Sequence, residues 1–226
     1  MKAPWMESGS PLGMVLGIFA REPVSGQVKT RLTPSLGAAE AAELYRLCLL
    51  ETVEAMSLAG FDPVIFFSGN EAYFRHSFPR HRRTPQQGGD LGERLARALA
   101  DGLLAGADGM VVIGSDAPDL PPPLVAAAFA ALREAEAVVA PALDGGYVLI
   151  GERTHHDALF RGIPWGGPQV LAATRAIAGR EGVSLAELEG WDDIDDPASL
   201  RRFVRRSPDS AAARYAAGLD LAGAGK

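Results

Sequence analysis

The order of hydrophobic and polar residues predicts strands and helices that alternate along the chain. Residues 14–19 form a continuous apolar run, as expected for a strand buried on both faces. Residues 38–57 instead predict a helix whose apolar face consists of Tyr45, Cys48, Leu49, Thr52, Val53 and Met56. Further runs predict strands at 62–68, 110–114, 137–141, 146–151 and 184–188, and helices at 89–105, 121–134, 168–180 and 197–205.

This alternation is typical of an α/β protein with a mainly parallel sheet that is covered by helices on both faces. No segment repeats at a fixed period. We expect residues 13–207 to form one domain. A weakly ordered N-terminus (1–12) and an Ala/Gly-rich tail (208–226) flank it.

The composition is that of an ordinary globular protein. Of the 226 residues, 47% are hydrophobic and 22% charged, which is enough for a large core. The net charge of −6 argues against a partner that is a nucleic acid polymer. No run has the length of a membrane span, and the first residues lack the apolar core of a signal peptide. The single cysteine, Cys48, excludes an intramolecular disulfide and is expected to be buried, so we predict a cytoplasmic protein without a membrane partner.

The segment that follows the first predicted strand combines three basic residues, Arg21, Lys29 and Arg31, with Gly26. Glycine lets a backbone approach an anion, and Lys and Arg neutralise it. Open α/β sheets bind ligands at the carboxyl ends of their strands, so this loop predicts a phosphorylated ligand. It matches neither the P-loop nor the dinucleotide fingerprint. A solvated surface loop is the alternative.

Two acidic segments follow predicted strands. In the first, we expect Asp119 to cap the helix that begins after it, which leaves Asp116 as a candidate ligand of Mg²⁺. In the second, Asp196 before a proline predicts a helix cap, while Asp193 and Asp195 would point to the same side of an extended chain. A bound cation would relieve the repulsion in this second segment, although a solvated acidic turn explains it equally well.

Three further patterns have mainly structural explanations. Residues 143–147 contain Asp-Gly between two predicted strands, a signal for a hairpin turn. Residues 86–94 place glycines before a helix, where amides can meet an anion, with Asp90 as its expected cap. The four histidines lack the spacing of metal ligands, so we interpret them as surface residues.

Taken in order, six motifs resemble a family of glycosyltransferase-like proteins in the nucleotide-diphospho-sugar transferase superfamily, some of which are assigned to arsenosugar biosynthesis. The motifs are A-R-x-P-x-x-G-x-V-K-T-R-L, Q-x-G-G-D-L-G-E-R, I-G-S-D-x-P-D-L, D-G-G-Y-x-L-I-G, I-P-W and D-I-D-x-P, within residues 14–205. More distantly, the chain is similar to molybdenum-cofactor and phospholactate guanylyltransferases and to the cytidylyltransferase for Kdo. The resemblance implies a GT-A type three-layer α/β/α sandwich and a divalent metal.

The resemblance also implies roles for individual residues. The nucleotide would be bound by Arg21, Gly26, Lys29, Arg31, Gln87 and Asp90. Mg²⁺ or Mn²⁺ would be held by Asp116, Asp195 and Asp193, with Lys29 and Asp116 as the catalytic residues. The acceptor side would comprise Asp144, Gly145, Gly146, Tyr147 and Trp165. At 165–168 this chain has W-G-G-P where the family commonly has W-S-T, so two hydroxyl groups are missing from the acceptor side.

Three functions stay open at this point. The first is glycosyl transfer from a nucleotide sugar to a small-molecule acceptor. The second is nucleotidyl transfer from a nucleoside triphosphate to a small phosphorylated acceptor, with release of pyrophosphate. The third is a nucleotide-binding regulatory protein without turnover, which the W-G-G-P departure would permit.

Overall fold

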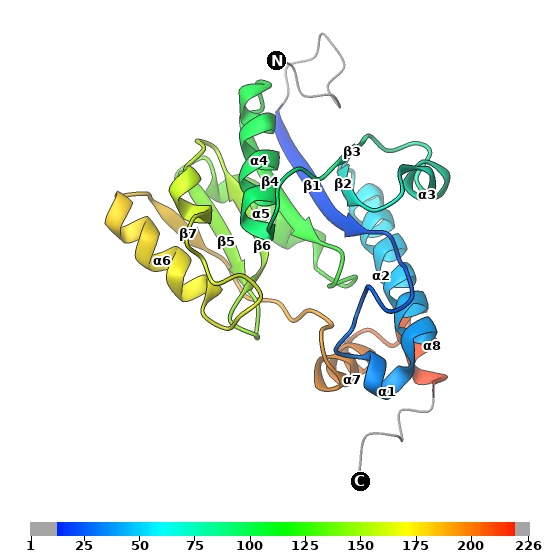
Figure 1. Cartoon of the computed structure of the whole chain (residues 1–226). Coiled ribbons are helices and arrows are strands. Elements are labelled where there is room, and N and C mark those ends of the chain that lie inside the picture. The colour runs from blue at the N-terminus through cyan, green and yellow to red at the C-terminus, as the bar shows by residue number, and fades with distance from the viewer. Residues whose placement is uncertain (1–12, 220–226) are drawn as a thin grey trace.

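A computed structural model of the chain describes residues 13–219 (Figure 1). A seven-stranded sheet has the strand order β3-β2-β1-β4-β6-β5-β7. Its strands are β1 (Met14–Arg21), β2 (Val64–Ser68), β3 (Arg83–Pro85), β4 (Gly109–Gly114), β5 (Ala137–Pro141), β6 (Tyr147–Glu152) and β7 (Leu185–Glu187). Only β6 runs antiparallel to its neighbours, so the sheet is mainly parallel and mixed, as predicted.

Helices cover both faces of this sheet, because the central strands are apolar on both sides. They are α1 (Thr33–Leu36), α2 (Ala38–Leu58), α3 (Glu71–Ser77), α4 (Leu91–Leu104), α5 (Pro122–Ala131), a 3-10 helix η1 (Asp157–Phe160), α6 (Val170–Glu181), α7 (Pro197–Arg206) and α8 (Ala211–Ala217). One core cluster joins the sheet to α4, η1 and α6, and a second joins it to α2, α3 and α5. The three-layer α/β/α sandwich is thereby confirmed.

A third core cluster lies beside the sheet, where the segment after β1 meets the last two described helices. It joins the first half of α2 to α7 and α8, with Leu44, Phe203 and Ala212 fully buried within it. Figure 1 shows α1, α2, α7 and α8 gathered at this end of the molecule. The expectation of a weakly ordered tail from residue 208 is therefore wrong as far as residue 219, since α8 is folded and packed. The other predicted terminus, 1–12, and residues 220–226 lie outside the described residues.

Candidate active site

A cavity of about 560 Å³ opens where β1 and β4 end and β6 begins. It is lined by most of the predicted site residues: Arg21, Lys29, Arg31, Asp90, Asp116, Asp144, Gly146, Tyr147, Trp165, Asp193 and Asp195. Three predicted residues, Gly26, Gln87 and Gly145, do not line it. The fold therefore brings together six segments that are distant in the sequence.

The basic loop after β1 is shaped by two buried anchors and two left-handed backbone positions. Val28 packs on Tyr45 of α2, and Leu32 is fully buried beside α1. Gly26 has a φ of 76° in the turn at the tip of the loop. Among residues 13–219, Lys29 is the single residue other than glycine whose φ is positive, at 48°. Lysine rarely adopts this left-handed backbone conformation. At position 29 the conformation accompanies a side chain that points into the protein, whereas at Gly26 it allows the chain to turn.

The ammonium group of Lys29 lies beneath the cavity, where its side chain is only 4% exposed. It forms an ion pair with Asp116 and donates a hydrogen bond to the carbonyl oxygen of Ile194. Burial disfavours the charged ammonium, but the negative groups nearby, of which Asp116 acts most strongly, together outweigh burial, and the pKa of Lys29 is raised above its usual value. Lys29 is thus a buried cation that joins two acidic segments.

Carboxylates from three different loops line the same cavity as Lys29. Asp116 lies just after β4, Asp144 lies in the turn between β5 and β6, and Asp193 and Asp195 precede α7. Burial, reinforced by the charges of Asp144 and Asp116, raises the pKa of Asp193 to about 6. Arg31 forms an ion pair with Asp195 at the exposed rim. The cavity floor therefore carries both signs of charge close together.

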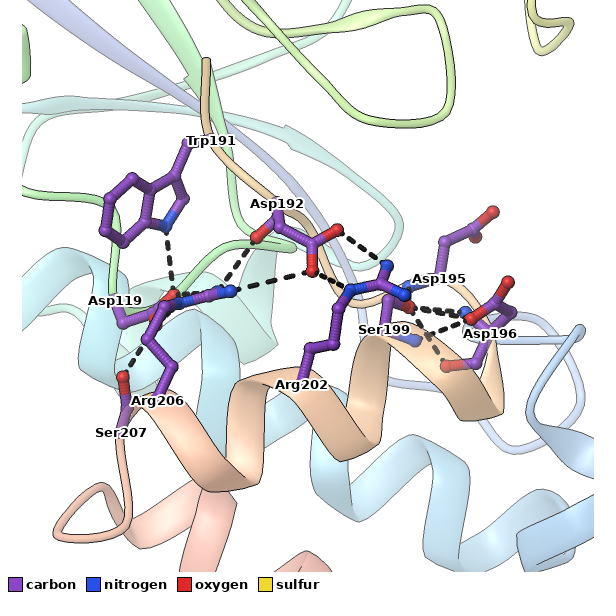
Figure 2. A network of polar contacts seen from close by, with 9 residues as sticks. All are labelled: Asp119, Trp191, Asp192, Asp195, Asp196, Ser199, Arg202, Arg206 and Ser207. Atoms are coloured by element: carbon purple, nitrogen blue, oxygen red, sulfur yellow. Dashed lines mark hydrogen bonds and ion pairs between the residues drawn. The ribbon is translucent and has the colours of Figure 1, made fainter. Parts of the chain in front are cut away.

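The acidic segment 191–196 alternates between two environments. Asp192 receives hydrogen bonds from Arg202 of α7 at 2.7 and 3.0 Å, and Asp196 caps that helix in a capping box with Ser199 (Figure 2). Asp193 and Asp195 line the cavity instead. The predicted cap at Asp196 is confirmed, and the two remaining aspartates share one side as expected of an extended segment.

Asp119 is not the helix cap that the sequence suggested. The residue at the cap position of α5 is Pro121, and that helix begins without a side-chain cap. Asp119 instead accepts hydrogen bonds from Trp191 Nε1 at 3.2 Å, Ser207 Oγ at 2.6 Å and the guanidinium of Arg206 (Figure 2). Burial alone would raise the pKa of Asp119, but these donors hold it below its usual range.

A buried tyrosine supports the basic loop from below. The hydroxyl of Tyr45 accepts a hydrogen bond from the backbone N–H of Arg21 at 2.8 Å and lies 2.8 Å from Ser115 Oγ. Burial raises the pKa of Tyr45, so the group stays neutral. Helical periodicity identified Tyr45 only as a core residue. The nearest hint of a further role is the Ser115-Asp116 pair after β4, since Ser115 is the side chain that the Tyr45 hydroxyl meets in the folded chain.

The segment 86–94 reaches the cavity through Gln86 and not through Gln87, the glutamine that the resemblance implied. Gln86 lines the cavity and donates hydrogen bonds to the carbonyl oxygens of Phe66 at 2.9 Å and Ala20 at 3.2 Å. Gln87 borders a separate shallow depression. Asp90 caps α4 by accepting from the N–H of Glu93 at 2.8 Å, as expected from the sequence.

The opposite wall combines a hairpin turn with two aromatic rings. Asp144 accepts a hydrogen bond from the N–H of Gly146 at 2.8 Å, and Gly145 turns the chain with a φ of 91°. The predicted turn is therefore present, and the same hairpin borders the cavity. Tyr147 and Trp165 meet edge to face with centroids 6.2 Å apart, so this wall offers an apolar surface beside a carboxylate.

The donor set suits a divalent metal only in part. Within residues 13–219, no three His, Cys, Asp or Glu side chains form a ready-made metal cluster. Mg²⁺, however, is usually bound through one or two carboxylates together with waters and substrate phosphates. Asp116 with a carboxylate of the 193–195 segment, beside a space lined by basic residues, fits that incomplete kind of site.

None of the helices described here is both long enough and apolar enough to cross a membrane.

Comparisons with known proteins place this geometry in context. No curated protein matches the chain. A crystal structure from Desulfovibrio desulfuricans G20, provisionally described as a nucleotide-diphospho-sugar transferase, is 31% identical with a TM-score of 0.84, over 90% of this chain and 94% of that one. Two more distant structures share the fold. CMP:2-keto-3-deoxy-manno-octonic acid synthetase in complex with CTP is 11% identical, with a TM-score of 0.55 over 87% of this chain and 99% of that one. 4-Diphosphocytidyl-2C-methyl-D-erythritol synthase is 14% identical, with a TM-score of 0.53 over 85% of this chain and 97% of that one.

The family model described as an uncharacterized protein conserved in bacteria (DUF2064) matches residues 52–167. That span includes β2 to β6 and the segment that carries Asp116, Asp144 and Trp165. The resemblance inferred from the six motifs is confirmed by this match and by the Desulfovibrio structure. The chain therefore belongs to the DUF2064 family and has the fold of nucleotide-diphospho-sugar transferases.

Proposed function

We propose that the chain is a transferase whose donor is a nucleotide sugar, and that it transfers the sugar to a small-molecule acceptor. The observation that carries the proposal is the cavity itself, in which a basic loop, paired carboxylates and an aromatic wall face one space. The 31% identical protein of Desulfovibrio, described as a nucleotide-diphospho-sugar transferase, supports the class of donor.

The residues suggest how such a donor would be bound. Its diphosphate would lie along the loop that carries Arg21, Lys29 and Arg31, where guanidinium and ammonium groups neutralise phosphate oxygens. The nucleoside would extend toward Gln86 and Asp90. The aromatic wall of Tyr147 and Trp165 would then be left for the sugar and the acceptor.

The carboxylates would hold Mg²⁺ or Mn²⁺. Asp116 and Asp195, with Asp193 as a further candidate, would bind the cation against the phosphates. When bound, the metal would neutralise charge that develops on the leaving diphosphate. Lys29 is placed to assist, because a cation that leaves Asp116 for the phosphate would stabilise the same charge.

Nucleotidyl transfer is a second candidate, and the fold likeness to cytidylyltransferases favours it. In that reaction the acceptor attacks the α-phosphorus of a nucleoside triphosphate, and pyrophosphate leaves. We place either reaction in the cytoplasm, because Cys48 is a buried free thiol of the kind found in reducing compartments.

The test combines a binding panel with product analysis. Nucleoside triphosphates and nucleotide sugars are screened by thermal shift with and without Mg²⁺ or Mn²⁺, since a specific ligand at a hundred times its Kd adds about 2.7 kcal/mol to stability. Release of a nucleoside diphosphate from a nucleotide sugar supports glycosyl transfer, and release of pyrophosphate from a triphosphate supports the second candidate. Binding without either product would indicate the regulatory alternative.

The first specific prediction concerns Asp116. Asp116→Asn should remove the metal dependence of nucleotide binding, because a neutral amide is a poor ligand for a hard cation. The matched control is Asp108→Asn, because Asp108 is an exposed aspartate that immediately precedes the first residue of β4, at the opposite end of the strand from Asp116. If Asp116→Asn keeps the metal response of the parent in the same panel, the metal assignment is wrong.

A further inference from the structure

Arg206 lies at the end of α7, behind the acidic segment and outside the lining of the cavity. Its side chain is 29% exposed, and the two carboxylates it contacts, Asp119 and Asp192, are only 12% and 8% exposed. An arginine that holds two buried carboxylates from different loops is placed to set the distance between those loops.

The contacts of Arg206 with the first loop form a fork. Nε donates to Asp119 Oδ2 at 2.6 Å and Nη2 to Asp119 Oδ1 at 3.0 Å. Asp119 lies three residues after Asp116, in the short segment between β4 and α5. Ser207 Oγ adds a further bond to the same carboxylate at 2.6 Å. The end of α7 is thereby fixed to the loop that carries Asp116.

The same guanidinium also holds the second loop. Nη2 donates to the carbonyl oxygen of Asp192 at 3.1 Å, and Nη1 lies 3.5 Å from Asp192 Oδ2. The guanidinium carbon lies 4.9 Å from the centre of the Trp191 ring, whose Nε1 donates to Asp119. Figure 2 shows these groups converging on one planar side chain from α7.

The two loops are also joined directly, by the hydrogen bond from the N–H of Ile194 to the carbonyl oxygen of Asp116 at 2.9 Å and by that from Trp191 Nε1 to Asp119 at 3.2 Å. Arg206 adds a bridge from α7 that contacts both loops at once. Arg202, one turn earlier in α7, reaches Asp192 but forms no hydrogen bond or ion pair with the Asp116 loop within the described chain. Arg206 is therefore the arginine of α7 that bridges both loops.

We propose that Arg206 is a positioning residue that fixes the acidic segment 191–196 relative to the loop carrying Asp116. Arg206 does not line the cavity, so it would contact neither the metal nor the nucleotide. It holds the two halves of the carboxylate set at the separation at which one cation reaches both. This inference rests on the proposed metal-assisted function, because it assigns the task of assembling that site.

The test measures coupling between metal and nucleotide. CTP, GTP and UDP-glucose are titrated into the parent by calorimetry with and without Mn²⁺, and the ratio of the two Kd values of the tightest ligand is the coupling factor. Arg206→Met should lower this factor at least about fivefold, within the usual range of coupling between sites. Metal-free binding through Lys29 and Arg31 should change less than twofold.

Arg205→Met is the matched control, because it removes the same charge from an exposed position of the same helix. It should leave the coupling factor unchanged. Arg206→Lys should fall between parent and Arg206→Met, since an ammonium cannot reproduce the fork to Asp119 and the bond to Asp192 together. If Arg206 had a purely structural role, Arg206→Met would unfold at a lower temperature than the parent, but its coupling factor, measured at a temperature where it is folded, would equal that of the parent.

If Arg206→Met does not fold, Asp119→Asn, which removes the partner charge, should lower the coupling factor in the same way. If the parent shows coupling and the folded variants match it, the positioning role is overturned while the proposed function stands. If the parent binds none of the three nucleotides, or binds them without any effect of Mn²⁺, the metal-assisted function fails and the positioning role falls with it.

Discussion

At the scale of single residues, the ammonium group of Lys29 lies beside Asp116, the residue proposed above to bind a metal ion. Its ammonium neutralises Asp116 and lies near Asp193, within a backbone conformation that lysine rarely adopts. A divalent cation arriving alone would have to displace it. A cation arriving with phosphate would not, because the ammonium could then move to the phosphate.

We therefore expect Lys29→Met to change two affinities in opposite directions. Mn²⁺ should bind the variant at least about fivefold more tightly than the parent in the absence of nucleotide, because a competing cation is removed. Nucleotide should bind roughly ten- to a hundredfold more weakly, the worth of a charged hydrogen bond. Titration calorimetry with each ligand alone measures both.

Arg31→Met is the control, since it removes the same charge from the same loop. The Arg31 side chain is 59% exposed, and an exposed ion pair contributes little, so its effect on Mn²⁺ binding should be small. Equal Mn²⁺ affinities for the parent and Lys29→Met would refute the idea that Lys29 competes with the metal.

At the scale of elements, the sequence predicted the helices and strands whose apolar residues follow a regular pattern, because that pattern reflects which side is buried. β5 was predicted at its observed bounds, and β1, α2 and α4 within a few residues, because apolar periodicity follows directly from packing on a sheet. β3 and α3 were not predicted. β3 is three residues long and mostly polar, and α3 buries only Phe74 along its length, so neither leaves a periodic signal.

The parts of the site that depend on tertiary contacts were also beyond the sequence. Asp119 has the local features of a helix cap, yet its partners Trp191 and Arg206 are 72 and 87 residues away. Gln86 and Gln87 are adjacent and chemically alike, and only the register of the strand end decides which one faces the cavity. By contrast, motif order alone placed Lys29, Asp116 and the 193–195 segment together.

Helix α8 offers a prediction at this scale. Glu51 of α2 accepts hydrogen bonds from Ser210 Oγ at 2.7 Å and from the N–H of Ala212 at 3.2 Å, at the start of α8. Glu51→Ala should lower the free energy of unfolding by about 1–2 kcal/mol, the usual cost of losing a cap and a favourable helix-dipole charge. Chemical denaturation measures the change.

Glu54→Ala serves as the comparison, because Glu54 is an exposed glutamate on the same helix. It should change stability by less than about 0.5 kcal/mol. The contribution of α8 to the fold would be contradicted if the two variants unfolded at the same denaturant concentration.

At the scale of the whole molecule, one ion pair makes stability depend on pH. Glu152 at the end of β6 is fully buried, and its Oε2 lies 2.8 Å from His155 Nδ1. The hydrogen bond to Glu152 raises the pKa of His155 above its usual value near 6.5. The native state therefore favours protonated His155. The stabilisation of the folded state by protonated His155 is complete below pH 6.5 and is lost as the pH rises through the pKa of His155 in the folded protein.

We expect His155→Gln to destabilise the protein more at pH 5.5 than at pH 8.5. Unfolding free energies of the parent and the variant are compared at both values. His76→Gln, at an exposed position of α3, should show no such difference. A destabilisation of His155→Gln that is equal at both pH values would show that the charged pair contributes nothing.

The contact between Lys29 and the carbonyl oxygen of Ile194 joins positions that are 165 residues apart. A ribosome makes roughly 5–20 residues each second, so Lys29 is synthesised on the order of 10–30 seconds before its partner exists. During that interval Asp116 and Asp144 are already present, but Asp193 and Asp195 are not. The complete charged lining of the cavity therefore exists only after the segment 191–196 has been made, and a chain that ended before α7 would also lack the core cluster that α7 and α8 form with α2.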